Sequence, residues 1–572
     1  NVLNGAAAAA VYGSRASNGV VIITTKRGKS GTPKVTFSTS MNVNQLRKKV
    51  FVSTYGKQFG FAGLRLHTIG GISAAQIAAN PGVTTTNILR DGTSTPLATN
   101  LVDVTRYDYQ DQIFRTGVGT DNYLSITGGN EKTQYLASVS YMKNQGIIKG
   151  ADFQRYGLKV RVDQHLNNWA KVSAGLNYIN TFSNEKPNGN VFYSPINSVN
   201  ITNNIYDITK RDAAGNLLSV EPTRVNPLST IEDMDFSQAT NRTIADLQLN
   251  LTPAKGLTID WVMGIDAFSQ LGKNTIKPYP YATEAGLPLE RYPMGFAATA
   301  SSNTFLFNTD LNIGYDKNLS DDVKMTLTAG FNHQYTQTDI STTTGQNLAP
   351  FIETVSGAAS TTVPATYGLD RYAVTGQFFQ ATFGYKNRAF LTGAIRRDGS
   401  TIFSPDQTNQ LYPKISGSYV LVEGKDGWLN GAKLRASFGD AGGLTALGTY
   451  DRFWQFSPAA YLGKSTILPG RQLANPSVKP ERMRELEFGG DFSLVKNKVS
   501  LGLTYYSQNI TDLVVNRVLA ASSGGTSIVN NVGEMQNKGF EVSLGANVIK
   551  TKDFSWDANV VFSSNRNKIT KL

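Results

Sequence analysis

The sequence predicts an all-β protein, namely an antiparallel transmembrane β-barrel that follows the end of a smaller domain. Three observations support this fold class. Segments of about ten residues alternate apolar with small polar side chains, as the strands of membrane barrels do. The connections between these segments are alternately short and long. No apolar run approaches the roughly 18 residues that a membrane-spanning helix needs.

The N-terminal stretch 6–28 differs from everything after it. It predicts a short Ala-rich helix, a turn at Asn18 and Gly19, an apolar β-branched strand at 20–25 and a basic exit at 26–28. The chain begins at Asn1 and shows no charged segment followed by an apolar one, so we expect no signal peptide in it. We therefore expect this chain to be a piece of a longer protein.

Seventeen strands are predicted after this stretch. Apolar residues take nearly every second position in segments such as 172–178, 307–315, 325–331, 499–505 and 542–548. Period two places them on one face of a strand, and Ser, Thr, Asn, Gly, Asp and Gln on the other, as a wide and wet lumen requires. The predicted strands lie near 34–45, 117–127, 133–144, 153–164, 170–182, 241–251, 257–270, 302–315, 322–337, 371–385, 388–396, 411–421, 432–438, 484–495, 498–511, 536–548 and 553–565.

The connections are the stronger signal, because a soluble β-sandwich also alternates. From the second strand on, short connections alternate with mostly long ones. The short connections are 128–132, 166–169, 252–256, 316–321, 385–387, 422–431, 496–497 and 549–553. The long connections are 46–116, 183–240, 271–301, 338–370, 439–483 and 512–535, and two shorter connections, 145–152 and 397–410, belong to the same series. Outer-membrane barrels have short periplasmic turns and long extracellular loops. The long loops are rich in Asn, Thr, Ser, Gly, Pro and Tyr, and we interpret their aromatic residues as packing the loops into compact structures.

The net charge of +13 comes from the N-terminal region. Eleven of the 55 basic residues lie in 1–90, before the first acidic residue, Asp91, and the basic residues beyond it nearly balance the 42 acidic ones. This distribution argues against a phosphate-binding face for nucleic acid. The 25 Tyr and 28 Phe are typical of the aromatic girdles at membrane interfaces.

Metal and thiol chemistry has little support in the sequence. Cysteine is absent, which excludes disulfides, thiolate ligands and cysteine nucleophiles. The three histidines, His67, His165 and His333, are far apart and are interpreted as isolated loop or turn residues. We predict no metal site.

Catalytic and cofactor motifs are also missing. The run GGNEKT at 128–133 lacks the spacing of a phosphate-binding loop and is interpreted as a hairpin turn. Two acidic pairs, Asp321 with Asp322 and Glu485 with Glu487, have no partner base and are interpreted as solvated or lumen-facing carboxylates. We predict no catalytic site, no cofactor and no enzyme.

The stretch AVYGSRASNGVVIITTKRG closely resembles the final segment of the plug domain in SusC/RagA-type TonB-dependent outer-membrane transporters. Segments at 123–156, 389–403, 433–443 and 530–544 are similar to barrel motifs of that family, in the family's order. At 479–489 the chain departs from the pattern, because Pro480 and Glu481 stand where the family usually has a Trp-Glu pair, which puts local loop packing in doubt. The plug-end match is carried by Tyr12, Gly13, Ser14, Arg15, Asn18 and Gly19.

A charged group near predicted strand and loop ends belongs to the same motifs. It consists of Arg396, Arg397, Asp398 and Arg435, which we interpret as one ion-pair cluster that pins loops at the barrel rim. The resemblance suggests a structural role, so no substrate-binding residue is assigned.

The resemblance implies a plug end at 1–30 and a truncated barrel at 31–572, with about 17 of about 22 strands present and about five missing after Leu572. Such a chain would have two unpaired edges and is not expected to fold alone. The implied location is the outer membrane of a Gram-negative cell, with long loops extracellular and short turns periplasmic.

The implied function is TonB-dependent import of a nutrient, most often an oligosaccharide and sometimes a peptide. The implied partners are a SusD-like surface lipoprotein, outer-membrane lipid, and the TonB-ExbB-ExbD complex, which would act through the missing N-terminal part. Two alternatives stay open: a TonB-dependent siderophore or cobalamin receptor, and a soluble all-β carbohydrate-binding adhesin.

Overall fold

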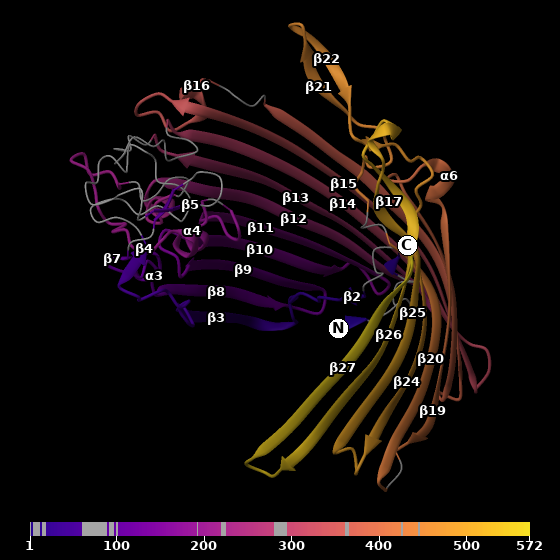
Figure 1. Cartoon of the computed structure of the whole chain (residues 1–572). Coiled ribbons are helices and arrows are strands. Elements are labelled where there is room, and N and C mark those ends of the chain that lie inside the picture. Colours follow the sequence, from indigo (N-terminus) through magenta and orange to yellow (C-terminus); the bar gives the residue numbers. More distant parts are fainter. Residues whose placement is uncertain are drawn as a thin grey trace.

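The protein is almost entirely β-structure in a computed structural model (Figure 1). The structure describes residues 2–3, 12–13, 19–59, 88–90, 96–98, 101–191, 193–218, 225–278, 294–360, 365–424, 427–443 and 447–572. Among these residues, no helix is long and apolar enough to cross a membrane.

The wall of the barrel consists of seventeen long antiparallel strands, each paired with the next along the wall. They are β3 (Gly31–Asn44), β8 (Gly117–Gly129), β9 (Thr133–Gln145), β10 (Asp152–His165), β11 (Ala170–Glu185), β12 (Met234–Ala254), β13 (Leu257–Ile276), β14 (Phe296–Asn318), β15 (Val323–Leu348), β17 (Thr366–Tyr385), β18 (Ala389–Ser400), β19 (Gln410–Glu423), β20 (Leu429–Gly443), β24 (Glu481–Leu494), β25 (Val499–Val518), β26 (Ser527–Lys550) and β27 (Ser555–Lys571).

These strands confirm the seventeen that the sequence predicts. Several extend further at the end that joins a long loop. For example, β15 continues to Leu348 where the prediction ended at 337, and β26 starts at Ser527 where the prediction began at 536. The extension of β15 was missed because residues 338–348 are mostly polar on both faces, so the alternation disappears.

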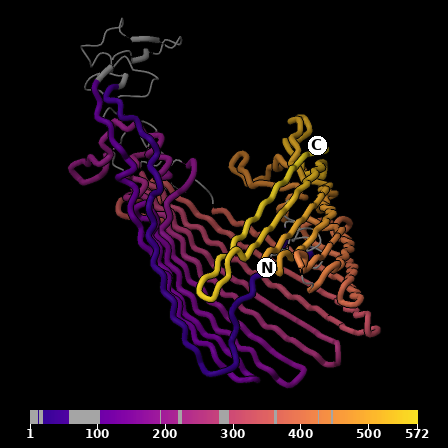
Figure 2. Tube along the Cα trace, turned by 90° about the horizontal axis from the view of Figure 1, so that it is seen from below, coloured from indigo at the N-terminus to yellow at the C-terminus, as the bar shows by residue number. Residues whose placement is uncertain are grey.

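The strand order places β27 next to β3. Residue-by-residue registers connect β3 to β8 and continue strand by strand to β27, but in the described part of the chain none joins β27 to β3. Both strands are exposed along nearly their whole length and lie at facing edges of the curved sheet (Figures 1 and 2).

The two faces of the wall differ as the alternation predicts. On the outer face apolar residues oppose one another across strands, as Val160 and Leu176 do between β10 and β11. The same belt continues around the barrel, for instance where Tyr505 of β25 opposes Phe540 of β26. The inner face carries polar and charged residues instead.

Short turns join the strands at one end of the barrel and long loops at the other. The turns are 130–132, 166–169, 255–256, 319–322, 386–388, 424–428, 495–498 and 551–554. The run at 128–133 is indeed a hairpin turn, between β8 and β9. The alternating series of connections that the sequence predicts is therefore confirmed.

Further short elements belong to the long loops. They are β4 (Lys57–Phe59), β5 (Ile88–Arg90), β6 (Pro96–Ala98), β7 (Leu101–Asp103), α3 (Gln110–Ile113), α4 (Pro195–Ile201), α5 (Ser229–Glu232), η1 (Val355–Gly357), β16 (Ala358–Ser360), α6 (Pro405–Thr408), β21 (Phe456–Tyr461), β22 (Lys464–Pro469), β23 (Gln472–Leu473) and η2 (Ala521–Ser523).

Two of the long loops share a hydrophobic core, and we call this unit the loop cap. The side chains of its core are buried, and they come from residues 101–116 and 186–233. Asn226, which is 1% exposed, stabilises the unit because its side-chain amide donates hydrogen bonds to the carbonyl oxygens of Ile208 and Leu218. The loop aromatics here pack the loops, as interpreted from the sequence. The core consists of Tyr109, Ile113, Val199, Ile208, Leu217 and Leu228.

Candidate functional site in the barrel lumen

The end of the N-terminal stretch lies inside the barrel. The strand predicted at 20–25 is shorter in the structure, where β2 (Val20–Val21) pairs with β1 (Val2–Leu3) and residues 22–29 have no ladder partner. That strand prediction was wrong beyond Val21, because the β-branched run crosses open space instead of joining a sheet. We call residues 19–28 the crossing segment.

One end of the crossing segment touches the wall formed by β20, β24 and β25. Val20 packs against Ala441, Met483 and Ile510, all on the inner face of these strands. The contact is apolar and small. It holds this end by packing alone.

The preceding turn contacts the same side of the lumen at Arg396 of β18. Gly13 is buried at a φ of 82°, and a β-carbon there would lie 2.5 Å from Nη2 of Arg396. Gly376 of β17 lies equally close to this guanidinium. Glycine is therefore required on both sides of Arg396, whose Nε donates to Asp398 at 2.6 Å with both side chains 3% exposed.

The other end of the crossing segment is held by charge at the opposite part of the wall. Arg27 donates to Gln248 of β12 at 2.9 Å and lies 3.4 Å from the carboxylate of Asp163 on β10. Asp163 is 1% exposed, and Arg161, Lys171 and the hydroxyl of Ser173 also face it. We call these residues the Asp163 cluster.

The exit of the segment is fixed by its backbone as well. Gly28 is buried, and a β-carbon there would collide with the backbone of Tyr135 at the start of β9. Lys26 lies 5.7 Å from the centre of the Tyr123 ring on β8. The crossing segment thus spans the lumen between an apolar contact and a buried ionic anchor.

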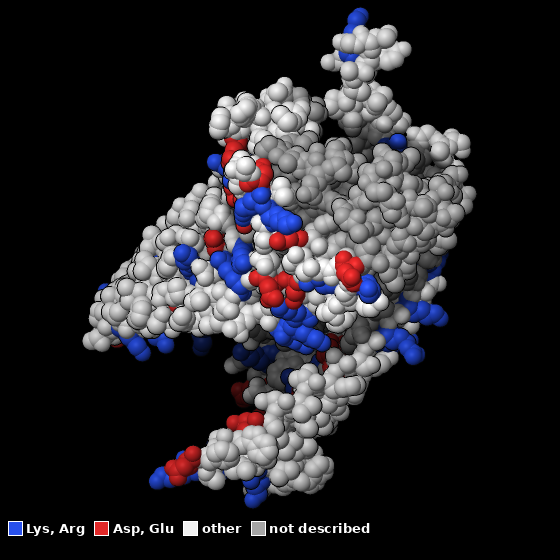
Figure 3. Space-filling model, turned by 60° about the vertical axis from the view of Figure 1, so that its left-hand side comes forward, with Lys and Arg blue, Asp and Glu red and all other residues white. Residues whose placement is uncertain are grey.

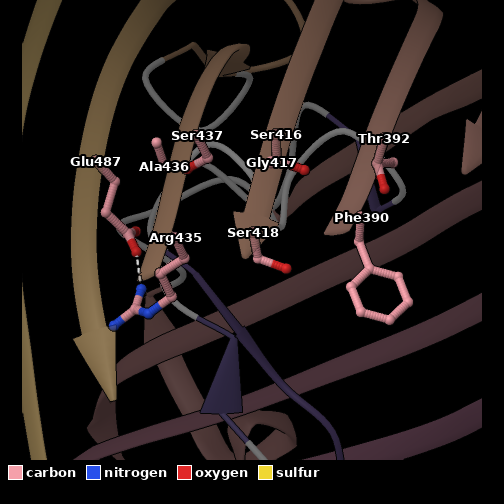
Figure 4. Close-up of a pocket in the computed structure, with 9 residues that line it drawn as sticks. All are labelled: Phe390, Thr392, Ser416, Gly417, Ser418, Arg435, Ala436, Ser437 and Glu487. Atoms are coloured by element: carbon pink, nitrogen blue, oxygen red, sulfur yellow. Dashed lines mark hydrogen bonds and ion pairs between the residues drawn. The ribbon is translucent and has the colours of Figure 1, made fainter. Parts of the chain in front are cut away.

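A polar pocket of about 180 Å³ lies in the inner wall at β18, β19, β20 and β24 (Figure 4). Thr392, Ser416 and Ser437 stand in one row across three adjacent strands. Arg435 donates to Glu487 and to Thr504, and lies 3.6 Å from Asp491. The lining therefore holds one cation and one carboxylate, with Asp491 beside it. Its lining consists of Phe390, Thr392, Ser416, Gly417, Ser418, Arg435, Ala436, Ser437 and Glu487.

The charged group predicted to form one rim cluster is divided in the structure. Arg396 and Asp398 form a buried pair in the lumen, whereas Arg397 faces outward and donates to Asn409. Arg435 belongs to the separate pocket near the short turns. The single-cluster prediction was wrong because neighbouring positions of a strand face opposite sides of the wall.

The acidic pairs take structural roles. Glu487 accepts from Arg435, and Glu485, which is 5% exposed, accepts from Gln508. Asp322 pairs with Lys386 between two neighbouring turns.

The histidines that the structure describes belong to strands. His333 lies within β15, where its Nδ1 is 2.8 Å from the hydroxyl of Thr375, and His165 is the last residue of β10. Their interpretation as loop or turn residues was wrong, because both positions are paired in the wall. His67 lies outside the described residues. In the described residues no group of histidine and acidic side chains could hold a metal ion.

The other sequence motifs are placed as follows. The departure at Pro480 and Glu481 does not disturb packing, because Pro480 is buried and Glu481 accepts from the N–H of Val514. Of the plug-end motif, Tyr12, Gly13 and Gly19 are described, and the remaining three residues lie outside the described part of the chain.

The charged side chains visible on one face gather in a mixed band of both signs, beside broad uncharged surfaces (Figure 3). An uncharged outer surface around a charged interior is the pattern of a barrel that spans a membrane. The fold and its interior therefore define a transmembrane barrel whose lumen holds the crossing segment.

Comparison with known proteins identifies the class. Residues 197–570 match the family described as TonB dependent receptor-like, beta-barrel, so the chain belongs to the TonB-dependent receptors, which are outer-membrane proteins. Within them it is of the SusC/RagA type.

The relatives support this assignment. TonB-dependent receptor P39 of Formosa agariphila is 26% identical over 586 residues, covering 100% of this chain and 52% of that protein. SusC of Bacteroides thetaiotaomicron is 24% identical, covering 100% of this chain and 56% of SusC. The chain thus spans about half the length of the curated relatives it matches.

Solved structures share the fold. The RagAB peptide transporter matches with a TM-score of 0.80 at 20% identity, covering 100% of this chain and 65% of that one. The siderophore receptor PirA of Acinetobacter baumannii matches with a TM-score of 0.51 at 12% identity, covering 100% and 66%.

Proposed function

We propose that this protein imports a nutrient across the outer membrane and that TonB supplies the energy. The observation that carries the proposal is the crossing segment, which spans a polar lumen and contacts the wall at both of its ends. Import of this kind needs binding and gating and no covalent chemistry. The residues 1–30 then act as the end of the plug, and 31–572 as the barrel.

The long loops face the cell exterior in this proposal. Short turns are periplasmic and long loops extracellular in outer-membrane barrels, and the two series here lie at opposite ends of the strands. The loop cap would then cover part of the extracellular mouth. The exit of the crossing segment enters β3 at its turn end, which places the plug connection on the periplasmic side.

The substrate we favour is a neutral oligosaccharide. The inner-wall pocket offers a row of hydroxyls, an arginine and a carboxylate, with Asp491 beside it, and all of these groups bond to sugar hydroxyls. The lining holds one positive and one negative group, so it has no excess of positive charge for an anionic ligand. A peptide is the second candidate, because the structural neighbour RagAB is described as a peptide transporter.

A SusD-like lipoprotein is the proposed partner at the extracellular mouth. The hairpin of β21 and β22 projects away from the barrel (Figure 1) and exposes large apolar side chains, among them Phe456, Tyr461, Leu462, Ile467 and Leu468. An exposed apolar patch of this kind is typical of a protein interface. The TonB-ExbB-ExbD complex would act through sequence that precedes Asn1.

Uptake by cells that express the full-length protein tests the proposal. Cells with and without the gene are supplied with neutral oligosaccharides, oligopeptides or ferric siderophores as the limiting nutrient. We expect gene-dependent growth on oligosaccharide that stops when TonB is deleted. Growth restored by siderophore alone would replace the proposal with the siderophore-receptor alternative, and a protein recovered from the soluble fraction without detergent would exclude a transporter.

A further inference from the structure

The outer face of the barrel changes from apolar to charged residues toward the loop end of β18 to β27. Along β24, Phe488 and Leu486 belong to the apolar belt, and the next two outward positions are Arg484 and Arg482. Along β20, the outward-facing residue Phe438 is followed, toward the loop end, by the outward-facing residue Asp440. Cations thus begin where the lipid-facing belt ends.

Asp440 holds the two arginines together. Its Oδ1 accepts from Nε of Arg484 at 3.1 Å, and its Oδ2 accepts from Nε of Arg482 at 3.0 Å. Asp440 is 1% exposed, while the side chains of Arg482 and Arg484 are 37% and 56% exposed. One buried carboxylate therefore presents two guanidinium groups to the surroundings with a net charge of +1. We call these three residues the arginine clamp.

Further outward cations flank the clamp on neighbouring strands. Arg397 of β18 opposes Leu411, whose carbonyl oxygen accepts from Arg482. Lys538 of β26 opposes Arg566 of β27, one step beyond the apolar residue Phe540. The positive charge therefore extends along the loop end of this half of the barrel.

The opposite half of the barrel also carries outward cations, but they are single lysines on separate strands. Lys143 of β9 opposes Gln154, and Lys273 of β13 opposes Ser237. An outward row nearer the middle of β11 to β15 is neutral or acidic and is linked by side-chain hydrogen bonds such as that from Asn180 to Asn241. A pair of arginines on one carboxylate thus distinguishes β18 to β27 from these single lysines.

We propose that the arginine clamp binds the phosphate of a lipid headgroup in the outer leaflet. The position beyond the apolar belt is the depth of lipid headgroups, and two guanidinium groups held side by side suit the oxygen atoms of a phosphate. Asp440 fixes their spacing and does not neutralise them. The inference rests on the proposed orientation, which places the loop end in the outer leaflet.

Lipid selectivity of the detergent-solubilised full-length protein tests the clamp. Binding of diphosphorylated lipid A is compared with binding of the same lipid after removal of both phosphates, and inorganic phosphate is tested as a competitor. Near a surface each cation contributes about 1 kcal/mol, so we expect the R482Q/R484Q variant to lose about tenfold or more of the preference for the phosphorylated lipid.

Two control variants separate lipid binding from other roles. The K143Q/K273Q variant removes two outward cations from the opposite half and should keep the preference. The D440N variant keeps both guanidinium groups but removes the carboxylate that fixes their spacing, so it should lose part of the preference for the phosphorylated lipid.

Equal binding of both lipids, or equal loss in K143Q/K273Q, would overturn the proposal. Displacement of the lipid by millimolar inorganic phosphate would also overturn it, because the surface would then be a site for free anions. Nutrient uptake is measured in parallel, since lost lipid selectivity with intact uptake contradicts only the clamp, whereas absent uptake by the unaltered protein contradicts the proposed function.

Discussion

At the scale of single residues, the most informative side chain is the carboxylate of Asp163. It is almost fully buried and faces Arg27 of the crossing segment, Arg161 and Lys171. Removing one partner of a buried ion pair leaves the others without compensation. Asp163 is therefore the point at which the crossing segment is fixed to the barrel wall.

Asp163→Asn should destabilise the full-length protein by about 3 kcal/mol or more, because the amide leaves these cations without a counter-charge. The lowered midpoint of thermal unfolding measures the loss, and protease cleavage within the crossing segment should appear with it. Ser173→Ala is the matched control, since it removes one hydrogen bond to the same carboxylate and should cost only about 1 kcal/mol. Equal stability of the two variants would contradict the anchoring role.

The sequence could not identify this cluster, although it predicted the strands that carry it. The predicted strand near 153–164 contains Asp163, but the partner Arg27 lies 136 positions away. Only the path of the crossing segment brings the two together. The arginine clamp was missed for a similar reason, because Asp440 and Arg484 meet through the pairing of β20 with β24, across the long loop 444–480.

At the scale of elements, the loop cap depends on ionised carboxylates. Lys49 lies 3.0 Å from Asp108 and 2.5 Å from Asp111 at the edge of the cap. Burial pushes the pKa of Asp108 upward, but hydrogen bonds from Lys49 and Gln110 outweigh burial and hold that pKa below 3.8. The Thr209 hydrogen bonds lower the pKa of Asp207 in the same way.

A depressed carboxylate pKa contributes stability that is present above the unfolded-state pKa and is lost as the pH falls through the folded-state value. We therefore expect the loop cap to stay closed from neutral pH to about pH 4 and to loosen below pH 3.8, while the barrel remains intact. Hydrogen exchange of the N–H groups in residues 101–116 and 186–233 measures the opening. Loosening that begins near pH 6 would contradict this assignment.

The hairpin of β21 and β22 should be dispensable for folding and required for partner binding. Its residues are nearly all exposed, so replacing 456–469 with a short Gly-Ser linker removes few contacts with the barrel. We expect unchanged thermal stability and loss of co-purification with the proposed SusD-like lipoprotein. Loss of folding, or retained co-purification, would exclude the hairpin as the docking surface.

The wall strands and the loops differ in how well the sequence predicts them. Period two and the alternating connections predicted all seventeen wall strands, because burial in lipid imposes the alternation on every strand. The same signal could not predict the extension of β15 toward the loops, or the hairpin, where no apolar environment selects one face. The β-branched run at 20–25 predicted a strand, but the lumen offers no ladder partner beyond Val21.

At the scale of the whole molecule, the assignment of an outer lipid face and an inner polar face can be tested with neighbouring residues. Leu176 faces outward on β11, whereas Asn177 faces the lumen. Leu176→Arg should destabilise the full-length protein in lipid vesicles by about 2–4 kcal/mol, because it places a charge in the bilayer. Asn177→Arg is the matched control and should cost much less. Urea unfolding measures both, and equal costs would contradict the assignment of faces.

The central claim is that the barrel crosses the outer membrane with its long loops outside and its short turns in the periplasm. The chain contains no cysteine, so single cysteines can be introduced into the full-length protein without background from this part. Ser465→Cys places a thiol in the β21–β22 hairpin, and Asn497→Cys places one in the turn between β24 and β25. In intact cells a membrane-impermeant maleimide should label the hairpin thiol at once, and the turn thiol only after the outer membrane is permeabilised. Labelling of the turn thiol in intact cells, with the hairpin thiol protected, would contradict the account.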